Sequence, residues 1–224
     1  MDKMNKNPGK RTDNKMLSGG MPNNNSKMGN ITQKWVNNLQ PFAEDYAARL
    51  TASLLSKKTG IPQQTASRCL NSLVKSSLIN YCIEGRNKLF YFDLKKQSTR
   101  NIFAMIENHK SLDFQVRNKK MAVMIDDILD WCDALVVFGS YASYTAHADS
   151  DLDVVIFNGD KKRIKEAIEK QPVEIHAHHI LFSEFYSLLK SKNALAIEIM
   201  DNHILFGDIS KLVDIFLRWF NGRR

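Results

Sequence analysis

Two aspartates separated by one residue, Asp151 and Asp153, are the first candidates for chemistry in this sequence. They precede the apolar run 154–157, which predicts a β-strand. Because residues i and i+2 of a strand point to the same face, we expect the two carboxylates to lie side by side. Carboxylate pairs hold divalent cations that neutralise a triphosphate during an in-line displacement. The pair therefore predicts metal-assisted chemistry at phosphorus.

A second candidate site, Gly139-Ser140, follows the apolar run 135–138, which predicts a short buried strand. Glycine has no Cβ, so backbone amides at this turn can approach phosphate oxygens closely. We expect Gly139 and Ser140 to bind the nucleotide phosphates, with the two aspartates at the start of the next strand.

Gly139-Ser140, ten further residues and then Asp151-Leu152-Asp153 resemble the G-S-x10-D-x-D signature of minimal nucleotidyltransferases in the DNA polymerase beta superfamily. The similarity covers roughly residues 121–206. It implies a small mixed β-sheet flanked by helices and a nucleoside triphosphate substrate. It also implies a third carboxylate on a following strand, which helps to hold the metal and takes the proton of the acceptor hydroxyl.

Glu174 is the only acid in the run 171–180, which follows a Lys-rich segment predicted to be a helix over 161–170. The resemblance therefore assigns Glu174 as the third catalytic and metal-binding carboxylate beside Asp151 and Asp153. The alternative is a solvated glutamate on an edge strand. Alternation along the strand places His176 and His178 on the same face as Glu174.

The histidines 176, 178 and 179 admit two interpretations. They could ligate zinc, although only His176 and His178 share a face and no further ligand is evident. The preferred interpretation places His176 at the rim of the active site, hydrogen-bonded to substrate or phosphate.

The segment after Gly139-Ser140 departs from the family pattern. Many members have arginines and glycines where this chain has Tyr141, Ala142, Ser143 and Tyr144. Positive charge near the triphosphate is thereby reduced, and Lys161, Lys162 or Arg163 could compensate. The departure leaves open whether catalysis is retained.

The N-terminal half carries a different pattern. Residues 51–58 and 62–76 have helical spacing and are separated by Gly60, and β-rich runs at 79–83 and 88–92 flank the turn 84–87. Two helices and a basic hairpin resemble the winged helix-turn-helix of bacterial and archaeal transcription regulators, which implies DNA binding by the second helix and the hairpin. The residues expected to contact DNA are Gln63, Gln64, Ser67, Arg68, Asn71, Arg86 and Lys88. Winged helices also serve as protein-interaction modules.

The charge distribution agrees with a nucleic-acid partner. The chain of 224 residues has a formal net charge of +8. Residues 1–30 have six Lys or Arg against two acids and residues 31–110 have twelve against five, whereas residues 111–224 have fourteen against seventeen. The basic excess lies entirely in the N-terminal half.

Three cysteines without C-x-x-C spacing indicate neither a disulfide framework nor a structural zinc site. No apolar run is long enough to cross a membrane, and no signal peptide is evident, so we expect a cytoplasmic protein without a membrane partner.

Four segments are predicted. Residues 1–30, rich in Asn, Lys and Gly, form a disordered basic arm, and 31–98 form the winged helix, in which helical spacing from Trp35 to Leu50 is interrupted by Pro41. Residues 99–130 form a helical linker that pairs two chains into a homodimer. Residues 131–224 form the nucleotidyltransferase domain and end in helices predicted at 184–190, 194–200 and 209–220, with Ser183 as a cap.

Together these observations predict an α+β protein that combines a winged helix with a polymerase-beta-type nucleotidyltransferase domain. We expect nucleotidyl transfer from a nucleoside triphosphate, ATP first, to a hydroxyl of a protein or a small molecule, with Mg²⁺ (or Mn²⁺). By analogy with nucleotidyltransferase antitoxins, the protein acceptor would be a toxin-like partner. The alternative is a transcription regulator whose nucleotidyltransferase-like domain senses nucleotide or dimerises without catalysis.

Overall fold

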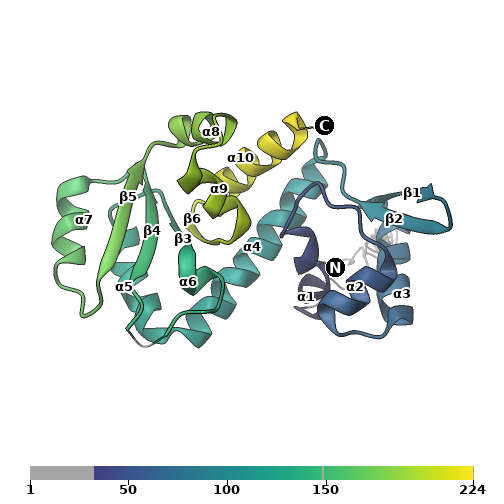
Figure 1. Cartoon of the computed structure of the whole chain (residues 1–224), viewed down its shortest axis with the longest axis horizontal. Helices are drawn as coiled ribbons and strands as arrows, with labels where there is room; N and C mark the ends of the chain where they lie inside the picture. Colours follow the sequence, from purple (N-terminus) through teal and green to yellow (C-terminus); the bar gives the residue numbers. More distant parts are fainter. Residues whose placement is uncertain (1–32, 148, 224) are drawn as a thin grey trace, which may run out of the picture. The chain divides into compact units, whose positions relative to one another are not determined.

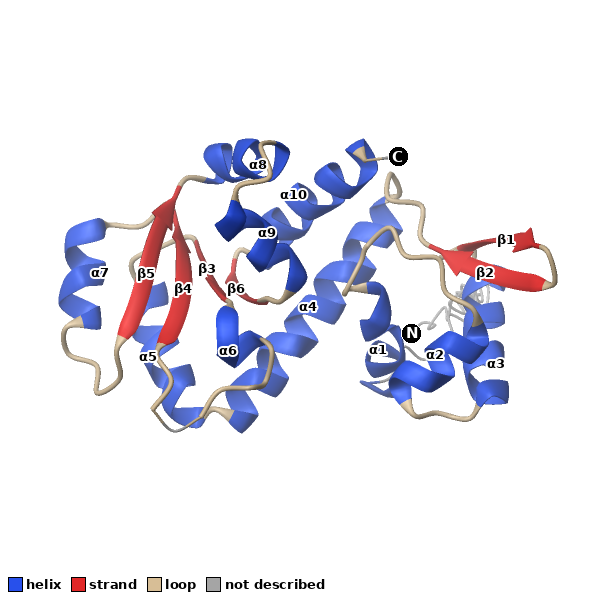
Figure 2. Cartoon of the chain, viewed as in Figure 1, coloured by secondary structure: helices blue, strands red, loops and turns tan. Residues whose placement is uncertain are grey.

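A computed structural model describes residues 33–147 and 149–223 of the chain, as a mixture of helices and two small sheets (Figures 1 and 2). This confirms the expected α+β class. The basic arm predicted at 1–30 lies outside the described residues. None of the helices described is long and apolar enough to cross a membrane.

The first described elements are the helix α1 (Gln33–Leu39) and the 3-10 turn η1 (Gln40–Phe42). The expectation of helical structure up to Leu50 is wrong beyond this point. Pro41 lies in η1, and the side chain of Asp45 accepts a hydrogen bond from the Ala47 amide, which stabilises a turn. Leu50 pairs with Phe90 as an isolated bridge, so the chain leaves η1 in an extended path.

The two predicted helices that follow are confirmed as α2 (Ala52–Thr59) and α3 (Gln63–Lys75). The Thr51 hydroxyl caps α2 by accepting from the Leu54 amide at 3.0 Å, and Gly60 ends the helix with a φ of 72°. Helix α3 buries Ala66, Cys69, Leu70 and Leu73, so its opposite face is left to polar side chains.

The predicted hairpin is also confirmed, as strands β1 (Asn80–Glu84) and β2 (Asn87–Tyr91). One polar contact ties it to α3, because the Lys88 ammonium donates to the Asn71 side-chain oxygen at 2.7 Å. The same ammonium lies 4.0 Å from the centroid of the Tyr81 ring. The hairpin and α3 are thereby joined by side chains as well as by the chain.

The segment predicted as a helical linker, 99–130, lies in two helices, α4 (Gln97–Arg117) and α5 (Lys119–Leu129), which meet at Asn118. The apolar residues that predicted this segment are buried within the chain, with Ile102, Phe103 and Ile106 in α4 and Met124 and Ile125 in α5. They contribute to the core of the single chain. The homodimer stays a prediction.

The second sheet has strand order β5-β4-β3-β6, with β3 (Ala134–Val137), β4 (Leu152–Phe157), β5 (Ile175–Ile180) and β6 (Ile204–Gly207). Strand β4 is parallel to β5, and β3 is antiparallel to both β4 and β6. The expected small mixed sheet is confirmed, and Figure 2 shows its strands with helices around them.

Alternate residues of this sheet pack into two separate cores. Val136, Val155 and Phe157 belong to a core that includes α8 (Phe182–Lys190), α9 (Ala194–Asp201) and α10 (Ile209–Gly222). Residues of opposite parity, such as Val137 and Val154, pack with α5 and α7 (Lys161–Ile168). Helices therefore cover both faces of the sheet.

The C-terminal helices lie close to their predicted positions, with one difference at α8. Ser183 is not its cap, because the helix already begins at Phe182. The Leu181 amide donates to the Glu184 carboxylate at 3.0 Å, so the side chain that satisfies the helix start comes from the first turn itself.

Candidate functional site

Gly139 and Ser140 begin a single helical turn, α6 (Gly139–Ala142), directly after β3. Gly139 has a φ of 65°, a conformation that L side chains rarely adopt. A Cβ at this position would lie 2.6 Å from Asp153 Oδ2. Glycine is therefore required both by the backbone and by the carboxylate that packs against it.

The backbone carbonyls of this turn are occupied by the segment that follows. The Gly139 carbonyl accepts from the Ser143 hydroxyl at 3.0 Å, and the Ser140 carbonyl accepts from the amides of Thr145 at 2.9 Å and Ala146 at 3.1 Å. These bonds fold residues 143–146 back onto Gly139-Ser140 and fix the shape of the turn.

Asp151 and Asp153 lie at the start of β4, as predicted, with Asp151 one residue before the strand. The Asp153 carbonyl accepts from the Phe138 amide at 3.1 Å, which holds the start of β4 against the end of β3. Strand parity places Asp153 on the same face as Val155 and Phe157. The Asp153 side chain remains 32% exposed, so ligands can reach it.

Glu174 and His176 meet these aspartates because β5 is parallel to β4. Asp153 is paired with His176 in the register, and the Glu174 carbonyl accepts from the Leu152 amide at 2.9 Å. Glu174 itself precedes β5. In the resulting arrangement His176 Nε2 lies 3.2 Å from Glu174 Oε1, and His176 Nδ1 lies 3.5 Å from Asp153 Oδ1.

Three side chains of this edge are close enough to share one cation. One ligand atom from each of Asp151, Glu174 and His176 lies within 4.8 Å of the other two. Carboxylate oxygens and imidazole nitrogens are ligands of divalent cations. Asp153 is outside this set and contacts it through His176. The structure therefore brings all three predicted carboxylates to one edge and joins Glu174 to Asp153 through a histidine.

Electrostatics follow from this placement. The hydrogen bond with Glu174 raises the pKa of His176, and the negative charges of Asp151, Glu174 and Asp153 act in the same direction. Burial, followed by the charges of Lys161 and His178, lowers the pKa of His179. Among the described residues, neither His178 nor His179 joins a metal-binding group, so the described part of the chain does not support the three-histidine zinc interpretation.

The basic residues considered as compensation lie at the far end of β4. Lys161, Lys162 and Arg163 begin α7, which follows the strand, whereas Asp153 lies at its start. The intervening strand spans on the order of 15 Å. Arg163 lies over the Trp131 ring, 4.9 Å from its centroid. These cations therefore do not replace the charge missing from the segment after Ser140.

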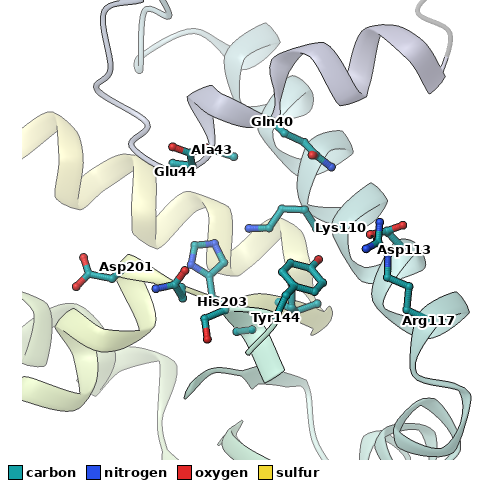
Figure 3. Close-up of a pocket in the computed structure, with 13 residues that line it drawn as sticks. Gln40, Ala43, Glu44, Lys110, Asp113, Arg117, Tyr144, Asp201 and His203 are labelled. Carbon is teal, nitrogen blue, oxygen red and sulfur yellow. Dashed lines mark ion pairs between the residues drawn. The ribbon is translucent and has the colours of Figure 1, made fainter. Parts of the chain in front are cut away.

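A polar cavity of about 300 Å³ has Ser143 and Tyr144 in its wall. Figure 3 shows Lys110 and His203 pointing into it, with Gln40, Asp113 and Arg117 around them. This cavity was not predicted from the sequence.

Behind Lys110 lies a fully buried carboxylate, Glu107. Its Oε2 pairs with the Lys110 ammonium at 2.8 Å, and its Oε1 accepts from the Tyr46 hydroxyl at 3.0 Å and lies 3.4 Å from His203 Nε2. Burial by itself would raise the pKa of Glu107, but the charges and hydrogen bonds of Lys110 and His203 outweigh it and lower the pKa to about 2. In the sequence, Glu107 and His203 each stand next to other polar residues, so neither was singled out.

The residues predicted to contact DNA divide into two groups. Gln63, Gln64 and Arg68 are exposed on α3, and Arg86 is exposed in the hairpin turn. Asn71 is engaged by Lys88 and donates to the Ser67 carbonyl at 2.8 Å, so these side chains fix the hairpin against α3.

The comparisons with known proteins concern the second half of the chain. Residues 126–206 match the family model of the nucleotidyltransferase domain. The matched region contains Gly139, Ser140, Asp151, Asp153 and Glu174, and it runs from within α5 into β6. Such domains act on nucleoside triphosphates with divalent metals.

Two further comparisons add no functional argument. A search of the curated proteins finds no match. A solved structure of TrmBL2, described as an archaeal chromatin protein with a novel mode of DNA binding, is 12% identical over 85% of this chain and 96% of that chain, with a TM-score of 0.22. A similarity at this TM-score supports no inference about fold or DNA binding.

Proposed function

We propose that this protein transfers a nucleoside monophosphate from a nucleoside triphosphate to a hydroxyl acceptor. The observation that carries the proposal is the convergence of Asp151, Asp153 and Glu174 beside the Gly139-Ser140 turn, inside the region that matches a nucleotidyltransferase domain. ATP is the proposed nucleotide and Mg²⁺ (or Mn²⁺) the proposed metal.

Each residue has a separate task in this reaction. Asp151, Asp153 and Glu174 would hold the divalent metal, which neutralises triphosphate charge and stabilises the displacement at the α-phosphorus. The Gly139-Ser140 turn would bind the terminal phosphates through backbone amides and the Ser140 hydroxyl. The rigid fold-back of residues 143–146 keeps that turn in one shape.

Glu174 is the proposed general base. Its exposed carboxylate would accept the proton of the acceptor hydroxyl while the acceptor oxygen bonds to the α-phosphorus and the bond to the bridging oxygen of the β-phosphate breaks, releasing pyrophosphate. His176 lies 3.2 Å from the same carboxylate and can orient it.

The test is transfer of label from each α-labelled nucleoside triphosphate to macromolecules or small products of a source lysate. The expected result is transfer by the wild type and its loss by at least about a hundredfold in the Asp151→Ala/Asp153→Ala variant. Asp149→Ala is the matched control, because this exposed aspartate belongs to the loop before Asp151 and to no metal-binding group. Transfer that survives the double substitution would contradict the proposal.

The helix–turn–helix and hairpin support a second function, binding of DNA as a winged helix. Exposed Gln63, Gln64 and Arg68 on α3 would enter the major groove, and Arg86 would contact the backbone. Lys88, Asn71 and Ser67 would position the hairpin. Combined with lost catalysis, this describes a regulator that senses nucleotide, an alternative favoured by the absence of basic residues among positions 141–144.

DNA binding is tested by the affinity for duplex DNA as a function of salt. Arg68→Ala/Arg86→Ala is expected to weaken binding at low salt and to reduce the slope of log affinity against log salt by about 2. Lys162→Ala/Lys165→Ala removes the same charge from α7 and is expected to leave the slope unchanged. Equal behaviour of the two double variants would contradict a winged-helix interface.

A further inference from the structure

We propose that Asp151, Glu174 and His176 form a mixed oxygen–nitrogen site that binds a first-row transition-metal dication in preference to Mg²⁺. The site rests on the proposed function, because it shares Asp151 and Glu174 with the proposed active site. To the proposed function the site adds His176 as a ligand and a preference for one class of metal.

The three ligands are brought together by strand pairing and not by one flexible loop. Asp151 directly precedes β4, and Glu174 directly precedes β5. The parallel register joins Leu152 to Ile175 and Asp153 to His176. The ligand atoms therefore lie within 4.8 Å of one another because two paired backbones position them.

The imidazole of His176 lies between two carboxylates. The Nδ1 atom of His176 faces Asp153 Oδ1 at 3.5 Å, whereas Nε2 faces Glu174 Oε1 at 3.2 Å. In the structure Nε2 shares a hydrogen bond with Glu174, so a cation bound at Nε2 replaces that proton, and the proton that remains on Nδ1 faces Asp153.

Once a cation replaces that proton, three electron-pair donors converge on it: oxygens of Asp151 and Glu174 and the Nε2 atom of His176. All three are accessible to solvent, so an ion can enter. The arrangement is that of a ligand set rather than of a buried structural network.

The imidazole decides the class of metal. Mg²⁺ prefers oxygen ligands and retains much of its water, whereas a nitrogen ligand favours first-row transition metals. Three protein ligands with open positions also suit Zn²⁺. We therefore expect affinities in the order Zn²⁺, Mn²⁺, Mg²⁺, from tightest to weakest.

The matched pair of variants is His176→Asn and His178→Asn. Asparagine can place its amide group near the position of Nδ1, so it can keep the contact with Asp153 while it removes the Nε2 ligand. His178 is exposed on the same strand and the same face but lies outside the ligand group. The two substitutions are identical in chemistry and differ only in whether a ligand is removed.

The experiment titrates the full-length protein with Mn²⁺ and follows the electron paramagnetic resonance signal of the free ion, at mildly alkaline pH so that imidazole is neutral. Zn²⁺ and Mg²⁺ are titrated in competition. Pulsed spectra of the bound Mn²⁺ report directly on coordinated ¹⁴N, and circular dichroism checks that each variant is folded.

The expected result is ¹⁴N coupling in the wild type and in His178→Asn, and its loss in His176→Asn together with a fall in Mn²⁺ affinity of about tenfold or more. Mg²⁺ affinity should be equal in all three proteins. The inference is overturned if the wild type binds Mg²⁺ as tightly as Mn²⁺. It is also overturned if His176→Asn binds Mn²⁺ as tightly as the wild type does.

The outcome is separable from that of the proposed function. Mg²⁺-dependent nucleotidyl transfer without ¹⁴N coupling would leave the proposed function standing and remove His176 from the ligand set. Mn²⁺ binding that depends on His176, without nucleotidyl transfer in the presence of any metal, would support His176 as a ligand and contradict the proposed function.

Discussion

Two glutamate–histidine pairs of this chain have nearly equal separations and opposite surroundings. His203 Nε2 lies 3.4 Å from Glu107 Oε1, and His176 Nε2 lies 3.2 Å from Glu174 Oε1. The side chains of the first pair are 3% and 0% exposed, whereas those of the second are 50% and 70% exposed. The comparison shows that burial, and not the pairing itself, decides what such a pair does.

The buried pair is closed by further partners. The Tyr46 hydroxyl and the Lys110 ammonium complete the surroundings of Glu107, and His203 Nδ1 lies 2.7 Å from the Ile199 carbonyl. A buried charge must be compensated in this way, because water cannot solvate it. The exposed pair leaves donor atoms free for a ligand, so the first pair supports the fold and the second is available for chemistry.

The largest expected effect comes from removal of the buried carboxylate. Glu107→Ala should lower the free energy of unfolding by about 3–5 kcal/mol, because Lys110, Tyr46 and His203 lose their common partner inside the protein. Glu174→Ala, at the exposed pair, should change it by less than about 0.5 kcal/mol. Denaturant unfolding of both variants measures the difference, and equal effects would contradict a different role for the two pairs.

The buried carboxylate should also make the stability of the protein depend on pH in the acid range. The pKa of Glu107 falls from an ordinary value of 4.5 to about 2 in the folded protein, so the unfolded chain binds its proton first as the pH falls. The stabilisation is therefore complete above about pH 4.5 and is lost between about pH 4.5 and 2, up to about 3 kcal/mol. Unfolding free energies across this window should fall less steeply for Glu107→Gln. Parallel curves would show that Glu107 does not contribute.

A smaller effect is expected from the hydroxyl of Tyr46. Tyr46→Phe keeps the ring stacked on Phe103 but removes a hydrogen bond to a buried charge, which should cost about 2 kcal/mol. Tyr81→Phe is the matched control on an exposed ring and should be neutral. Thermal melts compare the stabilities of the two variants. If Tyr46→Phe does not lower stability, Lys110 and His203 alone compensate the charge of Glu107.

An effect on stability of this size or smaller is expected from the glycine at the exposed site. Gly139→Ala and Gly85→Ala both place a side chain at positive φ, which costs about 1–2 kcal/mol. Only the Cβ at Gly139 meets a carboxylate, that of Asp153, whereas the Cβ at Gly85 has nothing within 4 Å. Gly139→Ala alone should therefore also weaken Mn²⁺ binding, and equal Mn²⁺ affinities would exclude a role for this packing.

Local elements were predictable because their signals are local. Thr51, Gly60 and the β-rich runs at 79–83 and 88–92 place α2, α3 and the hairpin within a residue or two of their observed bounds. The prediction of a helix beyond Phe42 was wrong because the deciding contact is distant in the sequence. Its apolar residues have helical spacing, but Leu50 pairs with Phe90, forty positions away, and that pairing is not encoded in local periodicity.

The candidate site was predictable in its residues and not in its geometry. The types and spacing of Gly139, Asp151 and Asp153 indicated the chemistry, and strand alternation put His176 on the face of Glu174. The alternation could not say which atoms would meet, because that depends on the register between β4 and β5. That register placed His176 between Glu174 and Asp153.

The sequence by itself determined the α+β class, most element boundaries and the carboxylates of the candidate site, since each depends on neighbours within a few turns of the chain. Only the tertiary structure decided that Glu107 and His203, 96 positions apart, are buried together while Glu174 and His176 remain exposed. The physical reason is that a charge has no fixed function until packing determines how much water and which partners surround it.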